Sequence, residues 1–178
     1  MRKIIILGQK SKEKKEILKA SLLAKIDNLE IKFEQDFKDF GYLPKLVILW
    51  EYNGVLTEAL INKYNIIRIH PSILPAFNTS TAVIDAYKSG VKVSGVTIHR
   101  VENPDMTGLI ISQYPVIIDN YTHFEGFLSE IEDLEIKLAI PTIKSILEDK
   151  IFDIVDLLSD RSQNTCGGCS GCKNSNCR

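Results

Sequence analysis

Cysteine is absent from the first 165 residues of this 178-residue chain, since all four cysteines lie between Cys166 and Cys177. A secreted fold held together by disulfides spreads its cysteines along the chain, so that class is excluded for residues 1–165. Long apolar runs are also missing. None approaches the roughly 20 residues that cross a bilayer, and the apolar segment after Lys3 is too short for the core of a secretion signal. We therefore expect a cytoplasmic protein with no membrane partner.

An excess of charge of one sign is also lacking. The formal net charge is −1 and the pI is about 6.3, so no field is available to hold a polyanion, and nucleic acid is not indicated as a partner. With 44% hydrophobic and 25% charged residues, the chain can build one core. We expect one domain over residues 1–158, a polar linker over 159–165 and a cysteine-rich tail over 166–178. Nothing in the sequence indicates an oligomeric state.

Glycine is scarce where a nucleotide-binding loop would need it. The strand pattern of residues 3–7 (KIIIL) is followed by the single Gly8 and then by a helix pattern over residues 11–26. The G-x-G-x-x-G pattern, whose glycines allow the backbone close to a pyrophosphate, is absent. A plain strand-to-helix turn is the favoured interpretation. The alternative is that Lys10 and Ser11, near a helix N-terminus, still meet a phosphate.

Strand and helix patterns alternate over the first ninety residues, and two strand patterns and a long helix pattern follow. Together they predict an α/β protein, a three-layer α/β/α sandwich on a largely parallel Rossmann-like sheet. Pro115 indicates an edge or a bulge in the last strand, and Pro141 a bend in the last helix. The remaining strands are expected at residues 29–33, 46–50, 66–70, 91–101 and 109–118, and the remaining helices at 55–64, 81–89 and from Phe124 to about Leu147.

The segment Ile66–Phe77 (IIRIHPSILPAF) combines a buried-strand pattern with a stiff turn. Pro71 favours an extended His70 and prevents the run from continuing as a helix. Ligands of open parallel sheets bind beyond the carboxyl ends of the strands, where His70 is predicted to lie. The sequence therefore makes His70 a candidate site residue, and the alternative is a structural histidine in the core or turn.

The same segment, together with residues 89–99 (SGVKVSGVTIH), resembles the formyltransferase family. The most similar branch is the phosphoribosylglycinamide formyltransferases, which typically read N-I-H-P-S-L-L-P, then G-V-K-V-T-G-x-T-V-H, then D-x-G-x-I-I-x-Q. The resemblance runs from about Leu46 to Lys150. It implies the formyltransferase fold, formyl-tetrahydrofolate as co-substrate and a small amine as acceptor.

The resemblance also implies catalytic roles, and two of its positions are changed. His70 stands at the family histidine, which stabilises a developing oxyanion. The family asparagine is Arg68 here, a replacement hydrogen-bond donor or a substrate clamp. The family aspartate, which manages protons through water, falls on Met106, and the neighbouring Asp105 is the candidate proton acceptor.

Many residues of the expected pocket differ from the family pattern. Where the family reads L-A-G-F-M-R-I-L at its folate-binding edge, residues 49–56 read LWEYNGVL, and Thr79 replaces a glycine of the substrate loop. By the resemblance we expect cofactor contacts from Val55 and Leu56 and from the loop formed by Val101, Glu102, Asn103 and Pro104.

The cysteine tail is outside the resemblance. Its four thiols at Cys166, Cys169, Cys172 and Cys177 have a density that suits zinc or an iron–sulfur cluster. The alternatives are a redox-active or an unstructured thiol tail. A second hypothesis for the whole chain follows, in which a catalytically altered formyltransferase scaffold serves as a binding or metal module.

Overall fold

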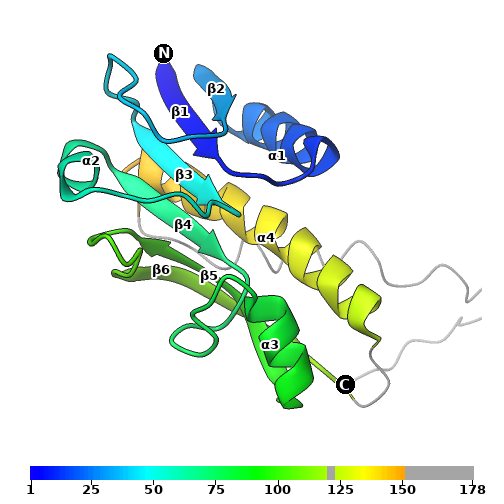
Figure 1. Cartoon of the computed structure of the whole chain (residues 1–178). Coiled ribbons are helices and arrows are strands. Elements are labelled where there is room, and N and C mark those ends of the chain that lie inside the picture. Colours follow the sequence, from blue (N-terminus) through cyan, green and yellow to red (C-terminus); the bar gives the residue numbers. More distant parts are fainter. Residues whose placement is uncertain (120–122, 151–178) are drawn as a thin grey trace, which may run out of the picture.

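Six strands pair side by side in the order β2-β1-β3-β4-β5-β6 in the computed structural model, which describes residues 1–119 and 123–150 (Figure 1). The strands are β1 (Arg2–Leu7), β2 (Leu29–Glu34), β3 (Leu46–Trp50), β4 (Ile66–His70), β5 (Val93–Arg100) and β6 (Ile110–Ile117). The helices among the described residues are α1 (Lys12–Lys25), α2 (Glu58–Lys63), α3 (Ala82–Ser89) and α4 (Phe124–Leu147).

Strand directions bear out the largely parallel sheet. The first four strands are parallel, whereas β5 pairs antiparallel with β4 and β6 antiparallel with β5. Strand β6 lies at the edge of the sheet beside β5, as Pro115 indicated, since an edge strand tolerates a missing N–H donor. The carboxyl ends of β1, β3 and β4 meet at one edge of the sheet.

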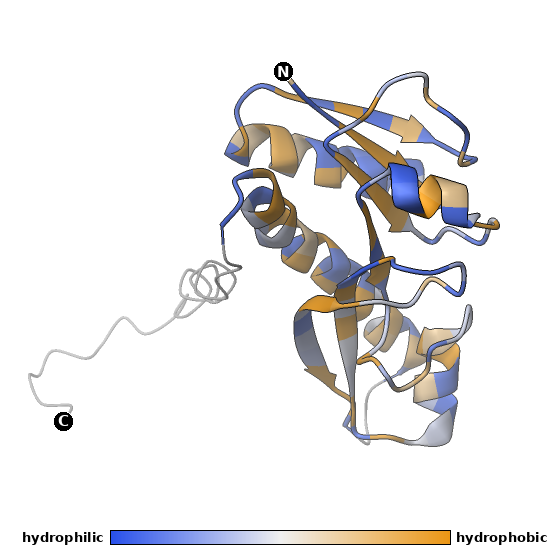
Figure 2. Ribbon diagram, turned by 90° about the vertical axis from the view of Figure 1, so that its left-hand side faces the viewer, coloured by the Kyte–Doolittle hydropathy of each residue, from blue (hydrophilic) through white to orange (hydrophobic). Residues whose placement is uncertain are grey.

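One face of the sheet is covered by α1 and α4, which pack against each other and enclose the larger hydrophobic core. Apolar residues spaced three or four apart along α4 are buried against this core: Phe127, Ile131, Leu134 and Leu138. Figure 2 shows the apolar strands between more polar helix surfaces. The helix continues through Pro141, so its predicted resumption beyond the proline is confirmed.

The other face carries a smaller core covered by α2 and by the segment that precedes β3. The rings of Phe37, Phe40 and Tyr64 pack there with centroids 5.5 Å apart. The predicted helix over residues 55–64 was too long, because Thr57 accepts a hydrogen bond from the backbone N–H of Leu60 and so caps the helix.

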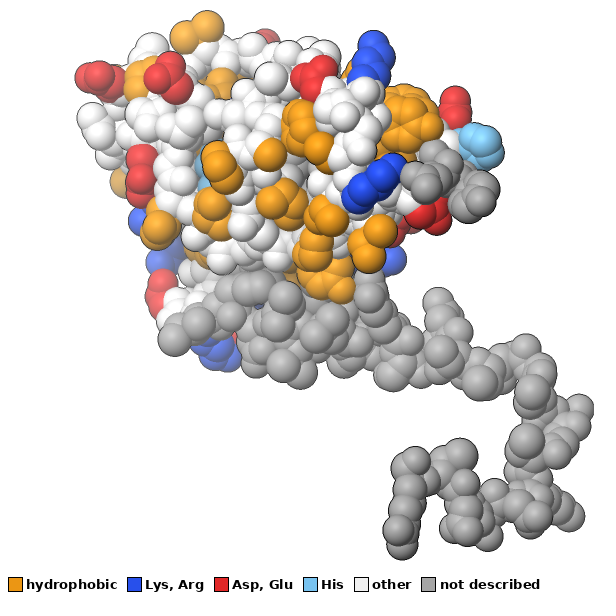
Figure 3. All heavy atoms as spheres, turned by 90° about the horizontal axis from the view of Figure 1, so that it is seen from below, with side chains coloured by type: hydrophobic (Ala, Val, Ile, Leu, Met, Phe, Trp, Pro, Cys, Tyr) orange, Lys and Arg blue, Asp and Glu red, His pale blue; other side chains and the backbone are white. Residues whose placement is uncertain are grey.

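Exposed apolar side chains gather around the β5–β6 edge, which includes Val93, Leu109, Ile110 and Ile117. Figure 3 shows hydrophobic side chains on the face seen from below Figure 1. In the part of the chain that the structure describes, no helix is both long and apolar enough to cross a membrane.

Candidate active site

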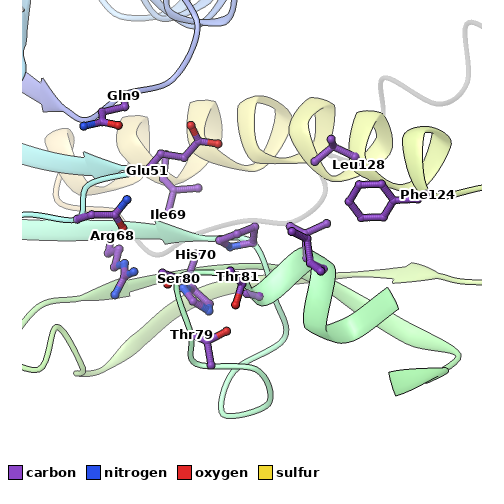
Figure 4. Close-up of a pocket in the computed structure, with 15 residues that line it drawn as sticks. Gln9, Glu51, Arg68, Ile69, His70, Thr79, Ser80, Thr81, Phe124 and Leu128 are labelled. Carbon is purple, nitrogen blue, oxygen red and sulfur yellow. The ribbon is translucent and has the colours of Figure 1, made fainter. Parts of the chain in front are cut away.

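A cavity of about 380 Å³ lies at the carboxyl ends of β1, β3 and β4, as the position of His70 predicted (Figure 4). Segments that follow these strands form one side, and the start of α3 and the first turns of α4 form the other. The lining residues are Gln9, Glu51, Asn53, Arg68, Ile69, His70, Pro71, Thr79, Ser80, Thr81, Ala82, Val83, Ile84, Phe124 and Leu128.

His70 ends β4 and is only 1% exposed. Its Nε2 lies 3.0 Å from the carbonyl oxygen of Phe77. A carbonyl only accepts hydrogen bonds, so Nε2 carries the proton and donates. Burial lowers the pKa of His70 to about 4, and the ring is therefore neutral at pH 7. Its buried Nδ1 is then an acceptor, and no group in the described residues bonds to it.

The turn that follows His70 is held by the hydroxyl of Thr97, a fully buried residue of β5. Thr97 Oγ1 donates to the carbonyl of Ser72 at 2.7 Å and accepts from the backbone N–H of Leu74 at 3.1 Å. It also accepts from Nε2 of Gln113 at 3.0 Å, and the same Nε2 donates to the carbonyl of Leu74. The Thr97 hydroxyl thus fixes the turn on the sheet and, through it, the carbonyl that orients His70.

Arg68 lines the same cavity from the middle of β4. Successive strand residues point to opposite faces, so Arg68 and His70 share the face opposite the buried Ile67 and Ile69. Burial lowers the pKa of Arg68, and no carboxylate of the described residues forms an ion pair with it. Its cross-strand neighbour His99 is buried, and burial lowers the pKa of that imidazole as well. Arg68 therefore presents an uncompensated, partly buried positive charge to the cavity.

A cluster of charged side chains lies on the opposite, α4 side of the cavity. The ammonium group of Lys10, 4% exposed, is 2.7 Å from Glu51 Oε1, 3.1 Å from Glu132 Oε1 and 3.0 Å from Glu135 Oε2. Glu135 is 1% exposed and also accepts a hydrogen bond from the indole N–H of Trp50 at 3.0 Å. The position of Lys10 depends on a close approach of β1 to β3, since a Cβ on Gly8 would lie 1.7 Å from the carbonyl oxygen of Trp50.

The two buried members of this cluster depend on each other. Burial acts to lower the pKa of Lys10, but Glu135 and Glu51 raise it above its usual value. Burial raises the pKa of Glu135, and Lys10 and Trp50 oppose that effect. Lys10 is thus committed to carboxylates of its own chain, and the alternative of a phosphate ligand for this lysine finds no support.

Asp105 lies outside the cavity, on an exposed loop that closes on itself. The backbone N–H of Glu102 bonds to the carbonyl of Thr107, and Asn103 bonds to Thr107 through both atoms of its amide. Met106 has a φ of 55° and packs against the smaller core. Of the predicted catalytic residues, the structure therefore brings Arg68 and His70 to one cavity and leaves Asp105 apart.

None of the six predicted cofactor residues is among the residues that line this cavity. Leu56 and Val101 are buried together in the smaller core, on the face of the sheet that Arg68 shares. Val55 is 84% exposed, and Glu102 and Pro104 are also exposed.

Glu51 is a charged lining residue that the sequence patterns did not single out. It has a φ of 55°, a backbone conformation that favours glycine, at the position where the formyltransferase pattern has glycine. A glutamate at a glycine position, in an otherwise matching segment, is the sequence feature that could have identified this residue.

The predicted metal ligands Cys166, Cys169, Cys172 and Cys177 lie outside the described residues. Within residues 1–119 and 123–150, no group of three or more His, Cys, Asp or Glu side chains is arranged to hold a metal ion.

Comparisons with known proteins agree with this geometry. The family model described as Formyl transferase matches residues 7–143. A phosphoribosylglycinamide formyltransferase of Bacillus subtilis is 39% identical over 105 residues, which are 58% of this chain and 54% of that protein. A formyltetrahydrofolate deformylase of Haemophilus influenzae is 33% identical over 113 residues, which are 62% of this chain and 41% of that protein. The chain thus spans about half the length of these curated relatives.

Among solved structures, a phosphoribosylglycinamide formyltransferase from Bacillus halodurans superposes with a TM-score of 0.72 at 25% sequence identity. The match covers 82% of this chain and 95% of that one. The fold is therefore that of this solved formyltransferase.

We predict that Thr97→Val destabilises the protein by about 2 to 4 kcal/mol, because three polar groups lose their buried partner. Urea unfolding measures this. Ser94→Ala is the matched control on β5, since the Ser94 hydroxyl is buried without a partner and its removal is expected to change stability by less than about 0.5 kcal/mol. Equal losses in both variants would show that the Thr97 hydroxyl does not hold the turn.

We also predict a pH-dependent contribution from His70. Its pKa is about 4 when folded and 6.5 as the ordinary value, so at pH 5 the unfolded chain binds a proton that the folded chain does not. Stability is therefore lost as the pH falls from about 6.5 through 4. Between pH 7.5 and pH 5 the wild type should lose about 2 kcal/mol more than His70→Asn in urea unfolding. His123→Asn, at an exposed site, should retain the wild-type slope; a wild-type slope in His70→Asn contradicts the assignment.

Proposed function

The chain belongs to the formyl transferase family, and on this premise we propose that it transfers a formyl group from formyl-tetrahydrofolate to a small amine in the described cavity. The observation that carries the proposal is the arrangement of His70 and Arg68. A buried imidazole nitrogen without a partner and a guanidinium without a counter-ion line one cavity at the carboxyl end of β4. Both groups have a hydrogen-bonding capacity that a reacting ligand can satisfy.

The reaction forms a bond between the amine nitrogen and the formyl carbon and breaks the bond from that carbon to the donor nitrogen. The proton that the amine releases ends on the departing donor nitrogen. Negative charge develops on the formyl oxygen meanwhile. A neutral His70 whose only N–H donates to Phe77 has no second proton for that oxygen. In our proposal Arg68 therefore supplies the donors for the oxyanion, and His70 Nδ1 accepts an N–H of the attacking amine and orients it.

Asp105 stays the candidate for the released proton, acting through water from its exposed loop. The donor's contacts are proposed at Val55 and Leu56 and at the loop of Val101, Glu102, Asn103 and Pro104. The burial of Leu56 and Val101 on the face that Arg68 shares supports a donor site on that side of the cavity.

We predict that Arg68→Met lowers kcat for formyl transfer by about 100-fold or more, since removing one preorganised oxyanion donor typically has that effect. His70→Ala is expected to lower kcat by about 100-fold as well, because the attacking amine loses the acceptor that orients it. Asp105→Asn is expected to lower kcat by about tenfold or more while leaving donor affinity unchanged. Stopped-assay kinetics and calorimetric titration with a folate analogue measure the two quantities. Lys38→Ala, an exposed lysine that does not line the cavity, is the control.

Water is the competing acceptor, because relatives of the chain include a formyltetrahydrofolate deformylase. Formate release at an equal rate with and without amines would favour hydrolysis over transfer. A folate analogue that does not bind, together with no release of the formyl group, would refute both activities.

The cysteine tail keeps its metal hypothesis, supported by sequence spacing alone. We predict zinc or iron in protein purified without oxygen, and its loss in Cys169→Ser. Elemental analysis measures this, and a metal-free wild type with four titratable thiols would remove the hypothesis.

A further inference from the structure

The charges around the cavity differ between its two ends, and this difference bears on the acceptor if the proposed function holds. Arg68 and His70 extend to one side of β4, whereas Glu51 points toward α4 (Figure 4). The reacting amine and the formyl donor belong at the end with Arg68 and His70. The rest of the acceptor then extends toward Glu51 and α4.

At this second end, Lys10 is not free to bind an anion. Its ammonium group contacts three carboxylates and is 4% exposed, so both its charge and its donors are already used. The nearby Lys14 pairs with Asp133 at 2.8 Å and with Glu132 at 3.7 Å. Two ammonium groups thus face four carboxylates, which leaves an excess of negative charge beside the cavity.

The start of α3, where an anion would otherwise find hydroxyl donors, is also occupied. Asp85 accepts hydrogen bonds from Thr79 at 2.6 Å and from Thr81 at 2.9 Å, and both threonines line the cavity. A phosphate placed there would displace a carboxylate of the chain itself. Arg68 is the only Lys or Arg among the lining residues, and it lies at the reacting end.

Glu51 is positioned to meet a ligand directly. It is the only carboxylate among the lining residues, and its side chain is 44% exposed although Oε1 is paired with Lys10. Its φ of 55° turns the side chain to the α4 side of the sheet. A non-glycine residue in this conformation raises the energy of the folded state, and such residues concentrate at functional sites.

Apolar side chains lie between the two ends. Val83, Ile84, Phe124 and Leu128 line the cavity and offer contacts to an aliphatic or ring-shaped spacer. The cavity itself is identified independently of the carboxylates, by the unpartnered Nδ1 of the 1%-exposed His70.

We propose that the acceptor is a cationic amine without a phosphate group: one amine reacts beside His70 and Arg68, and a second, positively charged group lies against Glu51 at the far end of an apolar spacer. The acidic cluster around Lys10 and the carboxylate of Asp85 repel a phosphorylated acceptor.

Three acceptors with the same reacting amine and the same four-carbon spacer test this: 1,4-diaminobutane, 1-aminobutane and 4-aminobutyl phosphate. With formyl-tetrahydrofolate held fixed, kcat/KM should be at least tenfold higher for the diamine than for 1-aminobutane, through KM, and lowest for the phosphate. Added salt should reduce the advantage of the diamine, because the contact is electrostatic and partly exposed.

The variant Glu51→Gln retains the shape of the side chain and removes its charge. It should reduce the ratio of kcat/KM between diamine and 1-aminobutane about tenfold, and Glu132→Gln should reduce it less. Glu130→Gln, an exposed site elsewhere on α4, should retain the wild-type ratio, and thermal unfolding of each variant checks folding.

Three results would overturn the inference: a preference for the phosphate, equal kcat/KM for all three amines, or an unchanged ratio in folded Glu51→Gln. No turnover of any of the three amines by a protein that binds the donor would also overturn it. A protein that neither binds nor consumes the donor refutes the proposed function itself, so the two failures are distinguishable.

Discussion

The hydroxyl of Thr97 is the contact on which the site depends. One buried oxygen on β5 holds Ser72 and Leu74, and Gln113 of β6 joins the same group. The two antiparallel strands at the end of the sheet therefore do more than extend it, because they fix the turn whose Phe77 carbonyl orients His70. A buried polar network with every member bonded specifies one geometry. This gives a physical reason for the family motif, in which a threonine and a glutamine accompany the histidine from strands far along the chain.

The two ends of the cavity differ in the charges that surround them. At one end Arg68 is partly buried without a counter-ion, and at the other Lys10 is fully paired with carboxylates. A buried charge without a partner is costly, so Arg68 is better explained by a ligand than by stability. Lys10, in contrast, is not available to a ligand, because its charge is paired inside the protein with Glu51 and Glu135. Formyl transfer, as in the family, and the proposed cationic acceptor are compatible, because they involve different ends of one cavity.

The fold could be predicted from the sequence because its signals are local. Runs of β-branched residues predict the strands, and the apolar spacing of residues in α4 predicts a helix with one buried face. His70 could be placed at a strand end for the same reason. The role of Glu51 could not be predicted, because the direction of its side chain follows from a φ of 55° and from Lys10, which pairs it with the distant helix α4. Nor could the sequence decide between Asp105 and Met106, since only the backbone of the loop determines which of two neighbours turns inward.

We propose that a formyl group is transferred from a folate to an amine in the cavity beside Arg68 and His70. The most direct measurement follows a ¹³C-labelled formyl group of formyl-tetrahydrofolate by NMR in the presence of 1,4-diaminobutane. We expect the label to appear as an N-formyl amine with the wild-type protein and to stay on the folate with Arg68→Met. A wild-type protein that neither binds the folate nor moves its label, or label that appears as formate alone, would contradict the proposal.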